Sequence, residues 1–113
     1  MNPEDRARAQ LEHLRETGRA RLGAARRGDW RTLERLEAER REALAAMALA
    51  DLAALAAAEP QAFTALQREL AEQDRLVASA LRGALATRES ALAGTRAQDR
   101  AERGYLKASR SSS

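Results

Sequence analysis

The chain has 113 residues and a formal net charge of +3, with 28 Ala, 19 Arg, 16 Leu, one Val, and neither Ile nor Cys. Residues that lose little side-chain entropy in a helix dominate and strand formers are nearly absent, which predicts an all-α protein of one domain. The lack of Cys excludes disulfides and thiolate chemistry, and the lack of an apolar leader or a bilayer-length apolar run predicts a soluble, cytoplasmic protein.

The first helix is predicted over residues 4–27, and the segment Arg27-Gly28-Asp29-Trp30 marks its end. Gly28 can adopt the left-handed conformation that closes a helix, and Asp29 is a preferred N-cap for the next helix. Apolar and small residues of the first helix recur at spacings of three and four, namely Ala7, Leu11, Leu14, Gly18, Leu22 and Ala25. We therefore expect an antiparallel hairpin that turns at Gly28-Asp29, with Trp30 as a packing anchor across the turn.

A second helix is predicted over residues 30–58, where Glu59-Pro60 ends it, and a third over residues 61–107. One face of the third helix carries Phe63, Leu66, Leu70, Val77, Leu81, Leu85 and Leu92. The expected fold is an antiparallel bundle of three to four helices, whose long C-terminal helix either continues past residue 100 or breaks and folds back near Gly94. A single helical domain then covers residues 1–108, and the Ser-rich residues 109–113 form a disordered tail.

The third helix is longer than either partner, so one side of it should remain uncovered and available to another protein. A spare apolar face of this kind suits the capture of an amphipathic helix. We predict a client-binding groove formed by Leu44 and Met47 of the second helix together with Leu70, Val77, Leu81 and Leu85 of the third.

The sequence contains no nucleophile paired with a base, so neither an enzyme nor a cofactor is expected. His13 has no second His and no Cys as a companion, which argues against a metal site. Asp74 is expected either at a helix seam opposite Arg40 or on a solvated flank. Residues 82–113 carry seven basic against three acidic residues, which favours an acidic protein partner over nucleic acid.

Two segments resemble the FliT-type flagellar export chaperones. The first is the run from Leu22 to Trp30, with Gly28-Asp29-Trp30 at the turn, followed by Leu33, Leu36-Glu37 and Leu44. The second is Gln73-Asp74-Arg75-Leu76 within a long helix, followed by Leu81, Leu85, Leu92 and Gly104-Tyr105-Leu106. The resemblance covers roughly residues 10–108, and the order and spacing of the pieces carry it more than any single piece.

The resemblance implies a chaperone that binds the C-terminal helical segment of the filament-cap protein and delivers it to the export gate and ATPase complex of the type III apparatus. The family's docking tyrosine near the end of the long helix would fall on Tyr105, followed by Leu106. In some bacteria such chaperones also act on a flagellar transcriptional regulator. A packing role for Tyr105 is the alternative from the residues alone.

Two other interpretations of the chain stay open. A sister class of chaperones, which serves the hook–filament junction proteins, has similar helices that composition does not separate. The other interpretation is a structural coiled-coil protein, which would form a homodimer through its long helix. Asp74, between Leu70 and Val77, interrupts the seven-residue register that such a coiled coil requires.

Overall fold

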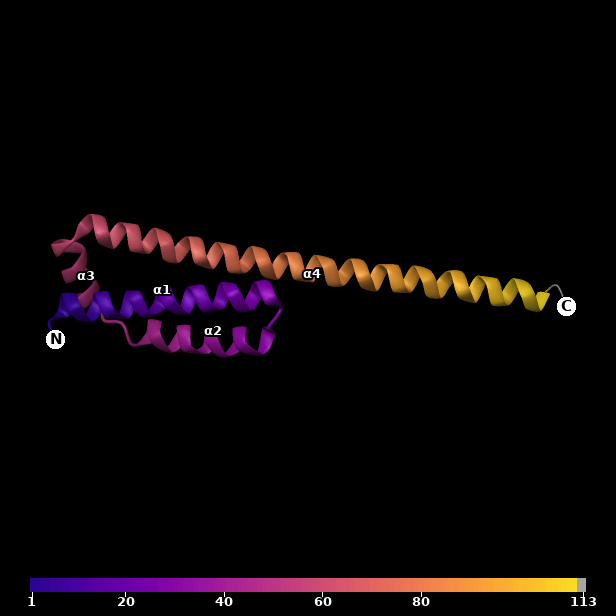
Figure 1. The fold of residues 1–113 in the computed structure, drawn as a ribbon, viewed down its shortest axis with the longest axis horizontal. Coiled ribbons are helices and arrows are strands. Elements are labelled where there is room, and N and C mark those ends of the chain that lie inside the picture. Colours follow the sequence, from indigo (N-terminus) through magenta and orange to yellow (C-terminus); the bar gives the residue numbers. More distant parts are fainter. Residues whose placement is uncertain (112–113) are drawn as a thin grey trace. The chain divides into compact units, whose positions relative to one another are not determined.

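The computed structural model describes the backbone of residues 1–111 and the side chains of residues 1–108. Within these residues the chain forms four helices and no strand, which confirms the all-α class (Figure 1). The helices are α1 (Pro3–Arg27), α2 (Trp30–Ala45), α3 (Leu49–Ala58) and α4 (Pro60–Ser111). The chain divides into two units, Met1–Leu81 (unit 1) and Arg82–Ser113 (unit 2), where the sequence led us to expect one helical domain.

The turn between α1 and α2 lies at the predicted residues. Gly28 has a φ of 70°, in the left-handed region, and its N–H donates to the carbonyl of Ala25 over 3.2 Å. Asp29 then caps α2, because its carboxylate accepts a hydrogen bond of 3.2 Å from the backbone N–H of Thr32. The two cap residues therefore produce the antiparallel hairpin of α1 and α2 (Figure 1).

Trp30 differs from the prediction. Its side chain is 44% exposed, and it belongs to neither buried cluster of unit 1. Trp30 is the first residue of α2, so it lies at the margin of the bundle beside the turn, where a Cβ added at Gly28 would be 3.9 Å from the indole. The capping groups, rather than a buried aromatic anchor, hold the turn.

The predicted single helix over residues 30–58 is wrong, because residues 46–48 separate α2 from α3. Ala48 is extended, with φ −94° and ψ 130°, and caps α3 without a side-chain hydrogen bond. This Ala-rich stretch contains no Gly or Pro, so local propensity favours a continuous helix and tertiary contacts must account for the break. The break allows α3 to pack on α1, where Leu55 is buried and Asp51 accepts from the Arg6 guanidinium over 3.1 and 3.2 Å.

The core of unit 1 consists of two small clusters of leucine, alanine and valine. Cluster 1 lies near the α1–α2 turn and contains Ala24, Ala25, Leu33, Leu36 and Val77. Cluster 2 contains Ala7, Leu11, Leu14 and Leu55, with Met47, Leu52, Phe63, Leu66 and Leu70 packed against it. Each cluster takes residues from α1 and α4, so the first turns of α4, up to Leu81, complete the bundle.

Helix α4 continues through Gly94, so the break and fold-back that the sequence left open do not occur. A helical Gly costs about 1 kcal/mol relative to Ala, and Ala91, Ala93 and Ala97 are strong helix formers that surround it. The helix extends to Ser111, so residues 109–111 of the predicted disordered tail have helical backbone. Residues 112 and 113 lie outside the described residues.

Candidate functional site

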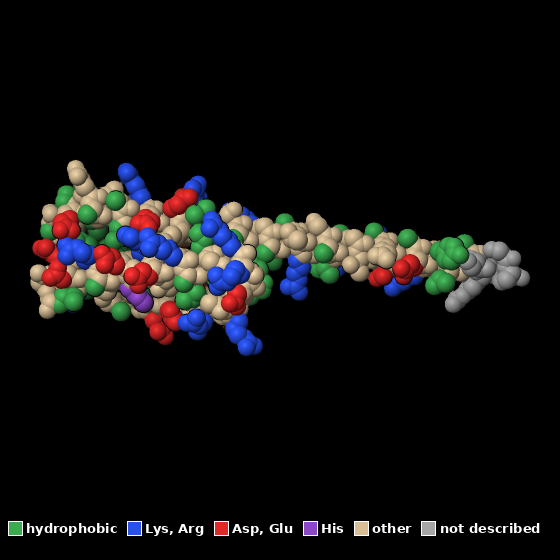
Figure 2. Space-filling model, viewed as in Figure 1, with side chains coloured by type: hydrophobic (Ala, Val, Ile, Leu, Met, Phe, Trp, Pro, Cys, Tyr) green, Lys and Arg blue, Asp and Glu red, His purple; other side chains and the backbone are tan. Residues whose placement is uncertain are grey.

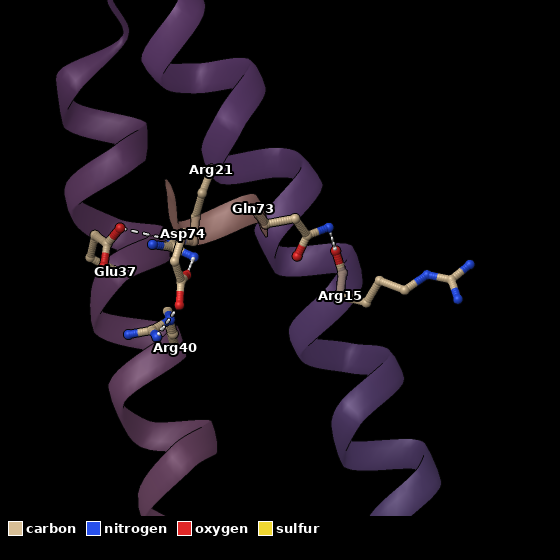
Figure 3. Close-up of polar contacts among 6 residues, drawn as sticks. All are labelled: Arg15, Arg21, Glu37, Arg40, Gln73 and Asp74. Atoms are coloured by element: carbon tan, nitrogen blue, oxygen red, sulfur yellow. Dashed lines mark hydrogen bonds and ion pairs between the residues drawn. The ribbon is translucent and has the colours of Figure 1, made fainter. Parts of the chain in front are cut away.

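A network of charged side chains, here called the polar layer, joins three helices of unit 1 between the two apolar clusters (Figure 3). Arg21 of α1 is its centre: Nε donates to Glu37 Oε1 of α2 over 2.7 Å and Nη1 donates to Asp74 Oδ1 of α4 over 2.8 Å. The other oxygen of Asp74 accepts from Arg40 Nη2 over 2.9 Å. Asp74 therefore lies at the helix seam opposite Arg40, one of the two predicted alternatives, although its side chain is still 43% exposed to solvent.

Burial and pairing act in opposite directions on Arg21, whose side chain is only 7% exposed. Burial alone would lower the pKa of the guanidinium, but the hydrogen bonds to Asp74 and Glu37 outweigh it and raise the pKa. Arg21 is therefore held as a cation inside the bundle, and both carboxylates of the layer are occupied by guanidinium groups. This arrangement links α1, α2 and α4 through side-chain contacts at one level of the bundle.

Gln73 extends the polar layer on the side facing Gly18. Its Nε2 donates to the backbone carbonyl of Arg15 over 3.0 Å (Figure 3), and its Oε1 is buried without a partner among the described residues. A Cβ at Gly18 would lie 2.0 Å from that Oε1, so only glycine admits the amide in this position. A larger residue at position 18 would therefore require the Gln73 amide to move from this position.

Neither Arg21 nor Gln73 was predicted as a site residue, although the spacing of the buried residues contains a signal for both. The buried line of α1 runs through Ala7, Leu11, Leu14, Gly18, Arg21 and Ala25, with spacings that alternate strictly between four and three. The predicted face of the first helix included only apolar and small residues, so it contained the partly buried Leu22 in place of Arg21. Gln73 occupies the corresponding position between Leu70 and Val77 on α4, where strict spacing would have identified it.

The six residues of the predicted client-binding groove have different environments. Val77 is 2% exposed and belongs to cluster 1, with Leu81 packed against that cluster. Met47 and Leu70 pack against cluster 2. Of the six groove residues, Leu44 and Leu85 have the most exposed side chains, at 43% and 57% exposure. Val77 is therefore a core residue of the folded bundle, and contact of a client with these residues stays a prediction.

Unit 2 differs from the bundle because its large apolar side chains face solvent. Every described side chain from Leu85 to Ala108 is exposed. Leu85, Leu92 and Leu106 are exposed by about half, and Tyr105, the predicted docking residue, is 73% exposed. Figure 2 shows green and blue side chains scattered along this helix. Tyr105 is thus not a buried packing residue in this structure.

The hollows of unit 1 are shallow. One of about 390 Å³ lies over Phe63, Leu55 and Leu66, and ion pairs border it: Arg8 with Glu59 over 2.9 Å and Arg15 with Glu69 over 3.4 Å. Four of the charged groups at its rim are thus paired with one another, and Glu12 is the remaining charged residue that lines it.

Among the described residues, no three His, Cys, Asp or Glu side chains are placed to hold a metal ion. None of the described helices combines the length and the apolar character needed to cross a bilayer. Comparison with family models, with curated proteins and with solved structures finds no match for this chain.

Proposed function

We propose that this protein is a non-enzymatic, cytoplasmic export chaperone of the FliT type. In this proposal it binds the C-terminal helical segment of the flagellar filament-cap protein and delivers it to the type III export gate and ATPase complex. Unit 1 supplies the stable helical body. Unit 2 supplies exposed apolar side chains for helical partners.

The observation that carries the proposal is the pair Leu85 and Leu92 in unit 2. They are seven residues apart, so they lie on the same side of the helix, and they are 57% and 48% exposed. Exposed leucines at helical spacing are the anchors with which one amphipathic helix recognises another. The resemblance of the segments around Gly28 and Tyr105 to FliT-type chaperones supplies the identity of the client.

The proposal is tested by binding of the full chain to a synthetic peptide of the filament-cap protein's C-terminal helix, measured by isothermal titration calorimetry. Leu85→Glu/Leu92→Glu should weaken binding by about tenfold or more, because it places carboxylates in an apolar contact. The matched control is Leu49→Glu, an 84% exposed leucine of unit 1, which should bind nearly as wild type.

Circular dichroism should show equal helix content in all three proteins, since the substituted side chains are exposed. No binding by the wild type would refute the client assignment, and equal binding by the Leu85/Leu92 variant would refute the site. Tighter binding of a hook–filament junction protein peptide would place the chain in the sister class instead.

Tyr105 and Leu106 carry the docking half of the proposal. Because the tyrosine ring is 73% exposed, Tyr105→Ala should leave helix content and client affinity unchanged. It should weaken docking to the export gate and lower secretion of the cap protein in cells. Normal secretion by this variant would reject the docking role.

A further inference from the structure

The C-terminal half of unit 2 carries a row of cations, here called the basic stripe, formed by Arg96, Arg100, Arg103 and Lys107. Their spacings are four, three and four residues. At about 100° per residue, this spacing keeps all four side chains within one narrow sector of the helix. All four are exposed, and Arg96, Arg100 and Arg103 line a shallow hollow of about 460 Å³ together with Ala93 and Asp99.

The arginines of the stripe are not neutralised by the chain itself. Over the described side chains of unit 2, Arg96, Arg100 and Arg103 form no ion pair, although Asp99 borders the same hollow. In unit 1, by contrast, several arginines on the helix surface reach carboxylates of a neighbouring helix, as Arg8 does with Glu59 and Arg15 with Glu69, whereas exposed arginines such as Arg31 and Arg68 do not. The three arginines of the stripe therefore form a concentrated positive field, with no ion pair to a carboxylate among the described side chains.

We propose that the basic stripe docks an acidic helix of a protein partner, whose carboxylates repeat at the same four–three–four spacing. The inference rests on the proposed docking role of this segment and names the chemistry of the partner. Leu106, 56% exposed and three residues after Arg103, lies on the flank of the stripe and supplies an apolar contact there. A neighbouring helix that follows the stripe presents side chains at this repeat, so each cation can meet one carboxylate.

Two other classes of anionic partner fit the segment less well. A helix that lies on an anionic membrane needs a broad apolar face opposite its cations. Here the side opposite the stripe carries Gly94, Ala101 and the polar Gln98, with Tyr105 as its one aromatic residue, so it forms no broad apolar face. A nucleic acid strand would require aromatic rings beside the cations for base stacking, and Tyr105 is two residues from Arg103, on nearly the opposite side of the helix.

The test uses the full chain and two synthetic helical peptides of identical composition, about 16 residues long. In the first, four Glu residues follow the four–three–four spacing on one face. In the second, the same four Glu residues are distributed around the helix. Fluorescence anisotropy at low salt should show about tenfold tighter binding of the first peptide, and this preference should shrink as salt is added.

The stripe variant is Arg96→Gln/Arg100→Gln/Arg103→Gln, which keeps the helix propensity of each position. It should lose about tenfold in affinity for the patterned peptide. The control Arg31→Gln/Arg41→Gln/Arg68→Gln removes the same charge from exposed positions of unit 1 and should lose less than about twofold.

Equal affinity for the two peptides, equal loss in the control, or tighter binding to phosphatidylserine vesicles or duplex DNA than to the patterned peptide would overturn the proposal. Client binding is measured on the same proteins. If the client peptide fails to bind while the patterned peptide binds, the chaperone assignment fails and the acidic-helix site stands. The reverse result removes the acidic-helix site alone.

Discussion

The two units of this chain use the same residue types in different ways. In unit 1, eight arginines lie within ion-pair distance of carboxylates, namely Arg6, Arg8, Arg15, Arg19, Arg21, Arg35, Arg40 and Arg75. The five arginines between residues 82 and 108 form none among the described side chains. Leucine differs in a similar way: Leu11, Leu14 and Leu55 of unit 1 are buried, although Leu44 and Leu49 are exposed, and Leu85 and Leu92 of unit 2 are exposed.

The difference follows from the number of helices in each unit. In unit 1, a side chain on one helix can reach two others, so most arginines are paired and the core leucines are covered. Unit 2 consists of part of one helix, which has no second element within the unit to pack against. Composition alone therefore does not separate a structural arginine or leucine from one that is available to a partner.

The strongest expected contrast comes from one substitution made in each unit. Leu55→Ala removes a side chain that is 3% exposed, and the cavity should lower the free energy of unfolding by about 3 kcal/mol. Leu92→Ala removes a side chain that is 48% exposed and should change the free energy of unfolding by less than about 0.5 kcal/mol. Urea denaturation followed by circular dichroism measures both, and similar losses at the two positions would break the comparison.

The second contrast concerns charge. Glu37→Ala/Asp74→Ala leaves the buried Arg21 cation without a carboxylate and should cost about 2 kcal/mol of unfolding free energy. The control Arg35→Ala breaks an exposed pair with Glu39 and should cost less than about 0.5 kcal/mol. If the double variant is as stable as this control in urea, the polar layer does not hold the bundle together.

The smallest expected effect is a dependence on pH that belongs to unit 1. The hydrogen bond from Arg6 lowers the pKa of Asp51 below its ordinary value of 3.8, against the opposing effect of burial. A depressed pKa in the folded state means that the ion pair stabilises the protein above the unfolded-state pKa of about 4 and loses its effect as the pH falls through the folded-state pKa.

Asp51→Asn should therefore be less stable than wild type near neutral pH, and the two proteins should converge in acid. Urea midpoints measured from about pH 7 to about pH 3 test this. Curves that stay parallel over the whole range would show that the Arg6–Asp51 pair contributes no pH dependence.

Local chemistry made the hairpin predictable. Gly28 closes the first helix through its own backbone conformation, and Asp29 caps the second through its own side chain. The identities of these two residues are therefore enough to place the turn. The break at residues 46–48 was not predictable in this way, because an Ala-rich stretch favours helix and only the packing of Leu55 and Asp51 on α1 opposes it.

The candidate site was less predictable than the fold. An apolar stripe on α4 is continuous in the sequence, but the pattern does not show how much of it another helix covers. Val77 is covered and Leu85 is exposed, although both belong to that stripe. Arg21 was missed because its charge suggested a solvated face, whereas its spacing from Gly18 and Ala25 matches the buried line.

Unit 1 holds its own core, and we propose that unit 2 is the partner-binding segment. Hydrogen exchange of the full chain, alone and with the client peptide, tests this most directly. In the free protein, amides of residues 7–25 should be strongly protected and those of residues 85–108 should exchange much faster, with protection of the latter rising on binding. Equal protection of the two segments in the free protein, or a client-induced rise confined to residues 7–25, would contradict the account.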